Sequence, residues 1–103
     1  MGNENTKHAQ VFKAFCDENR LTIPRVLRSG EKCACKLQDA LSIGQSALSH
    51  PMKILCESGI VNVRKEGKWA YYSISPAARE PGLQLMTQYT EITSDEPDCD
   101  CRE

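Results

Sequence analysis

The chain has little of what a membrane or secreted protein needs. No apolar run approaches the roughly 20 residues of a membrane-spanning helix, and residues 1–5 lack the charged and then apolar layout of a signal peptide. We therefore expect a cytoplasmic protein without a membrane partner. Aromatic residues make up only 6% of 103 residues, which predicts one small domain with a thin core. Such a core is marginal in a monomer, so the composition favours a homodimer.

The sequence also lacks the residue patterns of an enzyme. We find no Ser/His/Asp set, no phosphate-binding glycine loop and no evident pair of catalytic carboxylates. A Cys/His nucleophile would have to use His8 or His50, the only two histidines, and both fit predicted helices better than a catalytic site. These absences predict a protein without catalytic activity.

Cysteine, by contrast, is abundant. Four of the six cysteines form two Cys-x-Cys pairs, Cys33 with Cys35 and Cys99 with Cys101. A reducing cytoplasm disfavours structural disulfides, so the pairs favour metal binding, metalloid binding or redox sensing. Two thiols this close in sequence are a ready ligand set for a thiophilic ion. The remaining two cysteines, Cys16 and Cys56, are expected to be buried packing residues.

Charge is unevenly distributed along the chain. From Glu91 onward six acidic residues stand against Arg102 alone, whereas residues 1–90 carry 12 basic and 8 acidic residues. A basic body can approach a polyanion through counterion release although the formal net charge of the whole chain is −1. We assign residues 1–92 to a folded domain and residues 93–103 to a flexible acidic tail that contains Cys99 and Cys101.

Hydrophobic periodicity predicts a mainly α-helical fold with one β-hairpin. The predicted helices cover residues 8–15, 20–27, 32–41 and 45–57, followed by a last helix after Pro81 and Gly82. Asp17 is placed to cap the second helix and Gly59 to end the fourth. Strands are predicted over residues 60–64 and 69–74. Pro24 should bend or shorten its helix.

This order of elements is that of a winged helix-turn-helix. The break at residues 42–44 lets the fourth helix cross the third and project its first turn into a major groove of double-stranded DNA. Polar and basic side chains suit contacts with bases and phosphates. The candidate DNA-binding residues are Gln45, Ser46, Ser49, His50 and Lys53 on the fourth helix, and Arg64, Lys65 and Lys68 on the hairpin.

Six segments of the chain resemble the ArsR/SmtB metalloregulatory repressors. They are DENRL at 17–21, CACKL at 33–37, GQSALSH at 44–50, MKIL at 52–55, SGIV at 58–61 and RKEGKW at 64–69. The resemblance covers roughly residues 8–75. It implies a homodimeric repressor that leaves its operator when an inducer binds, with the first and last helices in the dimer interface and the fourth helix recognising DNA.

The same resemblance implies an arsenic site. Cys33 and Cys35 fall where arsenical repressors of this family carry three thiolates, and Gln38 replaces the third cysteine. Inorganic arsenic(III) usually takes three thiolates, whereas a methylated arsenical leaves two positions for sulfur. The implied inducer is a trivalent arsenical, arsenite or methylarsenite, with antimonite sharing the thiolate chemistry. Cys99 and Cys101 would complete this site or form a second one.

Geometry adds an expectation about the switch. Two cysteines two residues apart on an ideal helix point about 200° apart, so binding both to one ion should distort the start of the third helix. That distortion would couple ligand binding to DNA release. Cys16 is the reserve candidate for a third sulfur. The last helix lacks the His and carboxylate ligands of the family's zinc sensors, which disfavours zinc.

Two alternative functions stay open. A redox or sulfide sensor would join two cysteines in a disulfide or polysulfide bridge. A structural winged-helix interaction module would carry its thiols incidentally. In addition, Pro51 lies where related sequences have a residue compatible with an unbroken helix. We therefore expect either that the fourth helix starts late or bends there, or that the operator contacts differ from those usual in the family.

Overall fold

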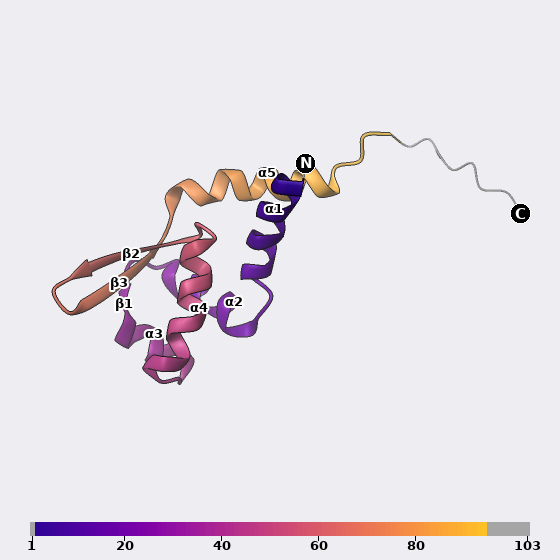
Figure 1. Cartoon of the computed structure of the whole chain (residues 1–103). Helices are drawn as coiled ribbons and strands as arrows, with labels where there is room; N and C mark the ends of the chain where they lie inside the picture. Colours follow the sequence, from indigo (N-terminus) through magenta and orange to yellow (C-terminus); the bar gives the residue numbers. More distant parts are fainter. Residues whose placement is uncertain (1, 95–103) are drawn as a thin grey trace, which may run out of the picture.

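The computed structural model describes residues 2–94, which form a mainly helical fold with one small sheet (Figure 1). In chain order the elements are α1 (Gly2–Ala14), α2 (Glu18–Leu27), β1 (Lys32–Cys33), α3 (Ala34–Leu41), α4 (Gln45–Glu57), β2 (Val61–Glu66), β3 (Trp69–Ile74), the 3-10 turn η1 (Pro76–Ala78) and α5 (Arg79–Thr90). This order confirms the predicted fold class. No helix in the described part of the chain is long and apolar enough to cross a membrane.

Two polar side chains hold the junction between α1 and α2. The Asp17 carboxylate accepts hydrogen bonds from the backbone N–H groups of Asn19 and Arg20 at 3.0 and 3.3 Å, which caps α2 as predicted. The Arg20 guanidinium donates to the carbonyl oxygens of Ala14 and Lys13 at 3.0 and 3.3 Å. Because these carbonyls lie at the end of α1, the bonds satisfy groups that have no partner within the helix.

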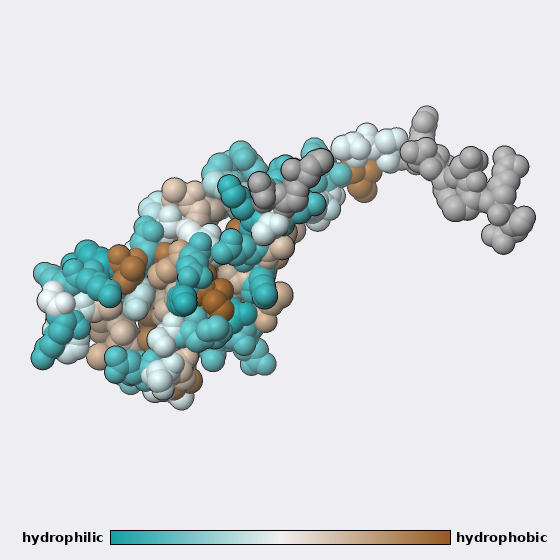
Figure 2. All heavy atoms as spheres, viewed as in Figure 1, coloured by the Kyte–Doolittle hydropathy of each residue, from teal (hydrophilic) through white to brown (hydrophobic). Residues whose placement is uncertain are grey.

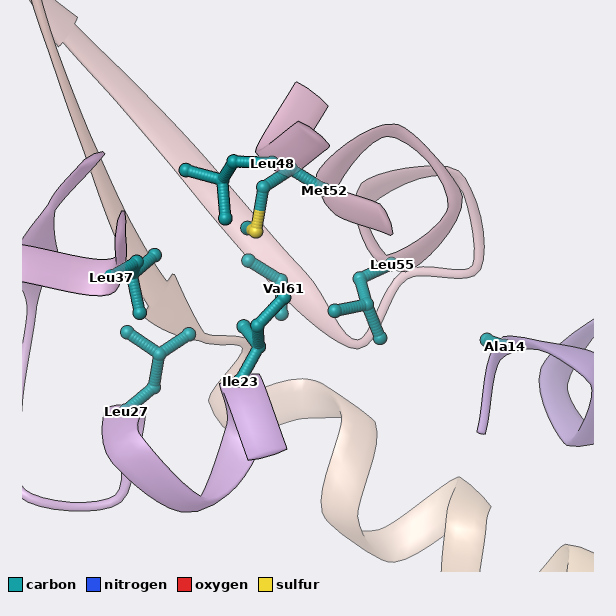
Figure 3. Close-up of a cluster of buried hydrophobic side chains, with 8 residues drawn as sticks. All are labelled: Ala14, Ile23, Leu27, Leu37, Leu48, Met52, Leu55 and Val61. Carbon is teal, nitrogen blue, oxygen red and sulfur yellow. The ribbon is translucent and has the colours of Figure 1, made fainter. Parts of the chain in front are cut away.

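The core lies between α2, α3, α4 and β2 (Figure 3). Its buried side chains are Ala14, Ile23, Leu27, Leu37, Leu48, Met52, Leu55 and Val61. Full burial of one such aliphatic side chain stabilises the fold by about 1.5–3 kcal/mol. In α4 the buried residues recur at i, i+3, i+4 and i+7 from Leu48 to Leu55, so one face of this helix packs inward and the other faces solvent.

The break between α3 and α4 is formed by residues 42–44, as predicted. Ser42 adopts the left-handed conformation, with φ 56° and ψ 45°. The Ile43 N–H donates to the Gln38 carbonyl oxygen at 3.1 Å, and the Gly44 carbonyl oxygen accepts from the Leu48 N–H at 3.1 Å. These bonds end α3 and start α4, so the turn sets how the two helices cross.

Neither internal proline cuts its helix short. Helix α2 continues through Pro24 to Leu27, and α4 runs without interruption from Gln45 through Pro51 to Glu57. The expectation of a late start for the fourth helix is therefore wrong. Pro51 is the seventh residue of α4 and is buried with the core face. Its ring adds apolar surface there, while its missing N–H removes one hydrogen bond of the helix.

Strands β2 and β3 form an antiparallel hairpin, which we call the wing. The ladder runs from Val61 opposite Ile74 to Glu66 opposite Trp69, so only Gly67 and Lys68 remain as the loop. Gly67 has φ 63° at the first loop position, as in a type II′ hairpin turn. The strands therefore extend further toward the tip than the predicted strand over residues 60–64 allows.

A third strand, β1, is absent from the predictions. It contains only Lys32 and Cys33, which pair with Tyr72 and Tyr71 of β3, and the sheet order is β1-β3-β2. The third helix consequently begins at Ala34 and not at Lys32. Two residues carry no readable periodicity, and their extended conformation depends on a partner strand that comes much later in the chain.

The first and last helices are longer than predicted, and they contact each other. Helix α1 begins at Gly2, and α5 begins at Arg79 with Pro81 in its first turn, where proline is tolerated. The Tyr89 hydroxyl of α5 lies 2.7 Å from Nδ1 of His8 in α1. Figure 1 shows both helices at the end of the molecule away from the tip of the wing.

Candidate nucleic-acid interface and thiol site

The polar face of α4 carries most of the candidate DNA-binding residues. Gln45 is the first residue of the helix and is exposed. Ser46, Ser49, His50 and Lys53 are also exposed, and their spacing of i, i+3, i+4 and i+7 places them in one stripe. The stripe lies opposite the buried face, so the packing of α4 leaves it on the surface of the molecule.

The wing provides a second group of basic side chains. Lys65 and Lys68 are exposed near its tip, and Lys68 Nζ lies 5.7 Å from the centroid of the Trp69 ring. Figure 2 shows a largely hydrophilic surface over the tip of the wing. With the stripe on α4, these lysines present polar and cationic groups from two elements that follow each other in the chain.

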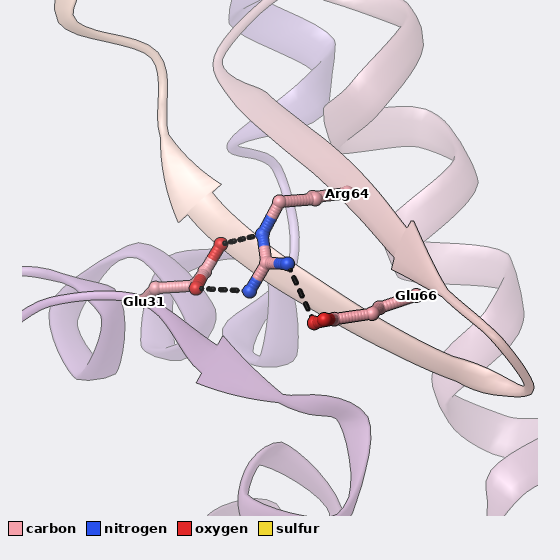
Figure 4. Close-up of polar contacts among 3 residues, drawn as sticks. All are labelled: Glu31, Arg64 and Glu66. Carbon is pink, nitrogen blue, oxygen red and sulfur yellow. Dashed lines mark hydrogen bonds and ion pairs between the residues drawn. The ribbon is translucent and has the colours of Figure 1, made fainter.

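Arg64 is held within the protein by two carboxylates (Figure 4). Its Nε and Nη2 donate to the two oxygens of Glu31 at 3.1 and 2.9 Å, and its Nη1 donates to Glu66 Oε1 at 2.8 Å. The guanidinium also stacks on the Tyr71 ring, 4.6 Å from its centroid. Arg64 therefore fastens the wing to the segment before β1, a partnership with Glu31 that the sequence does not reveal.

These ion pairs act on the protonation of both partners. The hydrogen bond from Arg64 lowers the pKa of Glu31 below the usual value of a carboxyl group. The hydrogen bonds to Glu31 and then to Glu66 raise the pKa of Arg64. Three of the five guanidinium N–H groups are used in this way, so Arg64 has less of its surface left for DNA than the two lysines.

The thiols of the first pair lie where the sheet meets α3. Cys33 is half-buried, pairs with Tyr71 in the sheet and is the N-cap residue of α3, with φ −76° and ψ 162°. Cys35 is the second residue of α3 and is exposed. Because Cys33 lies outside the helix, the expected 200° separation on an ideal helix is wrong. That ion binding distorts the start of α3 stays a prediction. Residues two apart have Cα atoms within about 7 Å.

One pocket joins the thiol site to the candidate DNA-binding surface. It has a volume of about 330 Å³ and is formed by α3, the first turns of α4 and the wing. Cys35 lines it together with Gln45, Ser49 and Lys68. The structure thus brings one candidate ligand and three candidate DNA-binding residues to the same pocket. We name this the wing pocket.

The other cysteines have different surroundings. Cys56 is half-buried and packs against the core as expected, and burial, followed by the charge of Glu57, raises the pKa of its thiol. Cys16 is exposed, so its predicted burial is wrong. Cys99 and Cys101 lie outside the described residues, as does most of the proposed tail. Within residues 2–94, no three His, Cys, Asp or Glu side chains are grouped to hold a metal ion.

Exposed apolar side chains gather on α1, α2 and α5 and just beyond, a surface that we call the apolar face. Its large members are Phe12, Phe15, Leu21, Leu83, Met86, Tyr89 and Ile92. A pocket of about 690 Å³ between these helices is lined by Phe15, Leu21 and Leu83. Apolar patches of this kind on a small protein mark interaction surfaces.

Two helices crossing at a short turn, an exposed polar stripe on the second of them and a hairpin behind it define a winged helix-turn-helix protein. Residues 17–63 match the family model described as "Bacterial regulatory protein, arsR family". The chain belongs to this family, whose members are DNA-binding transcription regulators and not enzymes.

Individual relatives agree with this assignment. An uncharacterised HTH-type transcriptional regulator from Methanocaldococcus jannaschii is 46% identical over 69 residues, which cover 66% of this chain and 78% of that protein. The arsenical resistance operon repressor of Bacillus subtilis is 36% identical over 70 residues, 67% of each chain. Among solved structures, a homodimeric winged helix-turn-helix DNA-binding domain from Mycobacterium bovis has a TM-score of 0.69 at 23% identity, with 93% of this chain and 92% of that one covered.

Proposed function

We propose that the protein is a cytoplasmic, homodimeric transcriptional repressor that leaves its operator when Cys33 and Cys35 bind a trivalent arsenical. The wing pocket carries the proposal, because Cys35 lines it beside Gln45, Ser49 and Lys68. A ligand on this thiol therefore lies against side chains that would face DNA. The arsenical resistance repressors among the relatives support the choice of inducer.

DNA binding would use α4 and the wing together. The first turns of α4 would enter the major groove, where the stripe of Ser46, Ser49 and His50 reaches base edges and phosphates. Lys65 and Lys68 would contact the phosphates beside the groove. In this arrangement the ion pair with Glu31 makes Arg64 the residue that keeps the wing at its angle to the body.

The cysteine pair has suitable chemistry and a suitable place for an arsenical. Thiolates are the ligands that soft, thiophilic ions prefer, and the two described thiols suffice for an arsenical that keeps one organic group. An inorganic arsenite ion would need a third sulfur, for which Cys99 or Cys101 is available in the sequence. A site made of Cys33 and Cys35 would thus accept a methylated arsenical without help from the tail.

Release of DNA would follow from how Cys33 and Cys35 are connected. Cys33 belongs to β1, which is hydrogen-bonded to strand β3 of the wing, and it is also the N-cap of α3. Drawing both sulfurs onto one arsenic atom therefore acts on the wing and on the helix that precedes α4. An inducer that binds better to the shifted arrangement lowers the population that fits DNA.

Homodimerisation is supported by the apolar face. Its residues on α5, among them Leu83 and Met86, are about half exposed in the single chain, at 53% and 52%. A small domain gains stability by covering such a surface. Two copies joined there would present two copies of α4 to successive half-sites of an inverted repeat, about 34–36 Å apart on B-DNA.

Operator release tests the function directly. A duplex that the purified protein selects from random DNA is labelled, and fluorescence anisotropy follows its release during titration with arsenite, methylarsenite or antimonite. We expect release from the wild type, no release from Cys33→Ser or Cys35→Ser, and normal release from the matched control Cys56→Ala. Complexes that persist at saturating concentrations of all three compounds would contradict the proposal, as would release from both serine variants.

The exposure of Cys35 makes a redox or sulfide sensor the second candidate. That function predicts release by an oxidant or a polysulfide in the absence of any arsenical, with DNA binding restored by a reductant. The same anisotropy assay separates the two, because an arsenical releases DNA under fully reducing conditions only if arsenic itself is the signal.

A further inference from the structure

The sheet register places a row of three side chains on one face of the sheet. Cys33 of β1 and Arg64 of β2 are both opposite Tyr71 of β3, and residues directly opposite each other project from the same face. The Arg64 guanidinium lies over the Tyr71 ring, 4.6 Å from its centroid. Ala70 and Tyr72 line the wing pocket, alternate with Tyr71 along the strand and face the other way. The Cys33 thiol therefore belongs to the row and not to the pocket.

Glu31 joins this row to the body of the molecule (Figure 4). It lies two residues before Cys33 and accepts hydrogen bonds from Nε and Nη2 of Arg64 at 3.1 and 2.9 Å. The sheet order is β1-β3-β2, so this ion pair reaches across β3 to a strand that is not the neighbour of β1. The turn before Glu31 is held by Lys32, whose Nζ donates to the Gly30 carbonyl oxygen at 3.1 Å. The segment that carries the Cys33 thiol is thus tied to both strands of the wing.

We infer that Glu31 is a positioning residue of the repressor: its ion pair with Arg64 holds the wing in the arrangement that binds DNA, and a ligand on Cys33 weakens DNA binding by breaking this pair. The inference rests on the proposed function and deepens it, because it names the contact that connects the thiol site to the wing. Glu31 itself touches neither the ligand nor the DNA.

Ligand binding requires a movement of the segment that carries Glu31. Cys33 faces the row, whereas Cys35 lines the wing pocket on the other side of the sheet. The two sulfurs meet on one atom when Cys33 turns out of the row, and residue 31 lies within about 7 Å of it along the chain. The hydrogen bonds from Arg64 are 2.9 and 3.1 Å long. A displacement of Glu31 by about 1 Å takes them beyond hydrogen-bond range.

The position of the wing matters for DNA because Lys65 and Lys68 lie nearer its tip than Arg64 does. Strand β1 pairs with β3 through only two residues, so the ion pair is a second fastening between the wing and the segment before α3. Without this pair the wing has to be ordered when DNA binds, which lowers the affinity. A ligand that no longer has to break the pair binds more tightly.

Glu66 provides a matched control. Its carboxylate accepts a hydrogen bond from Arg64 Nη1 at 2.8 Å, but it lies on the same strand as Arg64 and moves with the wing. Replacing either glutamate by glutamine removes one negative charge, which by itself raises the affinity for a polyanion. A loss of operator affinity in Glu31→Gln therefore has a sign opposite to that of the charge effect, and Glu66→Gln measures the charge effect alone.

Operator binding by the full-length protein tests the positioning role. We expect fluorescence anisotropy to show an operator affinity about two- to fivefold lower for Glu31→Gln than for the wild type. Glu66→Gln should bind at least as tightly as the wild type. In an Arg64→Gln background, Glu31→Gln should cause no further loss. Circular dichroism checks that all variants are folded. Unchanged or tighter binding in Glu31→Gln would overturn the inference, as would an equal loss in Glu66→Gln.

Calorimetric titration of the DNA-free protein with methylarsenite tests the link to the thiol site. Glu31→Gln should bind this probe about two- to fivefold more tightly than the wild type, and Glu66→Gln should match the wild type. Equal affinities in Glu31→Gln and the wild type would contradict the link. Failure of the proposed function looks different: the wild type then keeps its operator at saturating methylarsenite, arsenite and antimonite, while Glu31→Gln still loses operator affinity. That result removes the inducer and leaves the wing-positioning role of Glu31 standing.

Discussion

At the scale of single residues, Arg64 shows how one side chain can join the wing to the body of the molecule. Its guanidinium spans from the wing to Glu31, which precedes β1 and the cysteine pair. Since both groups are about half exposed, solvent screens the ion pair, and its value lies more in fixing geometry than in stability. Arg64 donates two parallel hydrogen bonds to the Glu31 carboxylate, and this bidentate geometry fixes the relative orientation of the two groups.

The pair predicts a pH dependence that Glu31→Gln should remove. The pKa of Glu31 is lowered in the folded state, so the ion pair stabilises the fold above the ordinary carboxyl pKa, 4.5, and loses this effect as the pH falls through the lowered value. Thermal melting from pH 7 to pH 3 should therefore show wild type above Glu31→Gln at neutral pH and the two curves converging in acid. In an Arg64→Gln background the difference should vanish; a gap that stays constant down to pH 3 would contradict this cause.

Among the cysteines that the structure describes, Cys56 should react most slowly with an alkylating reagent. Burial and the neighbouring Glu57 raise the pKa of its thiol, which lowers the fraction of reactive thiolate at any given pH. We expect iodoacetamide at pH 7.5 to modify the exposed Cys16 and Cys35 severalfold faster than Cys56, as measured by peptide mass spectrometry over time. In denaturant the rates should become similar. Modification of Cys56 in step with Cys16 in the native protein would show that its partial burial gives no protection.

At the scale of elements, helices and turns with strong local signals are predictable from the sequence. Asp17 and Gly59 mark helix ends because a cap or a positive φ depends on the residue itself. The continuity of α4 through Pro51 is not predictable, because burial of the ring in the core outweighs the lost hydrogen bond. Whether a helix continues through a proline depends on tertiary packing, and the hydrophobic periodicity of the sequence carries no information on that packing.

The candidate site also has features that the sequence predicts and features that it does not. The stripe on α4 is predictable, since helical spacing alone places its residues on one face. The extended conformation of Cys33 and the place of Cys35 beside Gln45 and Lys68 in the wing pocket are not, because both depend on contacts between elements that lie far apart in the chain. Long-range pairing of this kind leaves no local trace in the sequence, so the geometry of the thiol site follows only from the fold.

The turn between α3 and α4 gives a prediction about stability. Ser42 is the only residue other than glycine with a positive φ among residues 2–94, and a left-handed conformation strains any side chain with a Cβ atom. After the greater chain entropy of glycine is subtracted, we expect Ser42→Gly to raise the unfolding free energy by about 0.5 to 1 kcal/mol. Ser42→Val should lower it. Urea denaturation measures both, and a destabilised Ser42→Gly protein would mean that the serine is needed for another reason.

At the scale of the whole molecule, the two ends have different surfaces. The stripe on α4 and the wing lysines present polar and basic groups, whereas α1, α2 and α5 carry the apolar face. This separation suits a dimer, because joining two copies through the apolar face keeps both DNA surfaces open. The contact of His8 with Tyr89 holds α1 beside α5, so the two helices would enter an interface as one unit.

The substitution Met86→Glu should dissociate the proposed homodimer into monomers. Met86 is 52% exposed on α5, in a row with Leu83 and Tyr89, and a carboxylate there would be buried without a partner in a dimer. We expect sedimentation velocity to show a dimer for the wild type and a monomer for the variant, with operator affinity reduced by about 100-fold because the two half-sites are no longer bound together. Val63→Glu, at a comparably exposed apolar residue of the wing, should remain dimeric. A dimeric Met86→Glu protein would place the interface elsewhere on the surface.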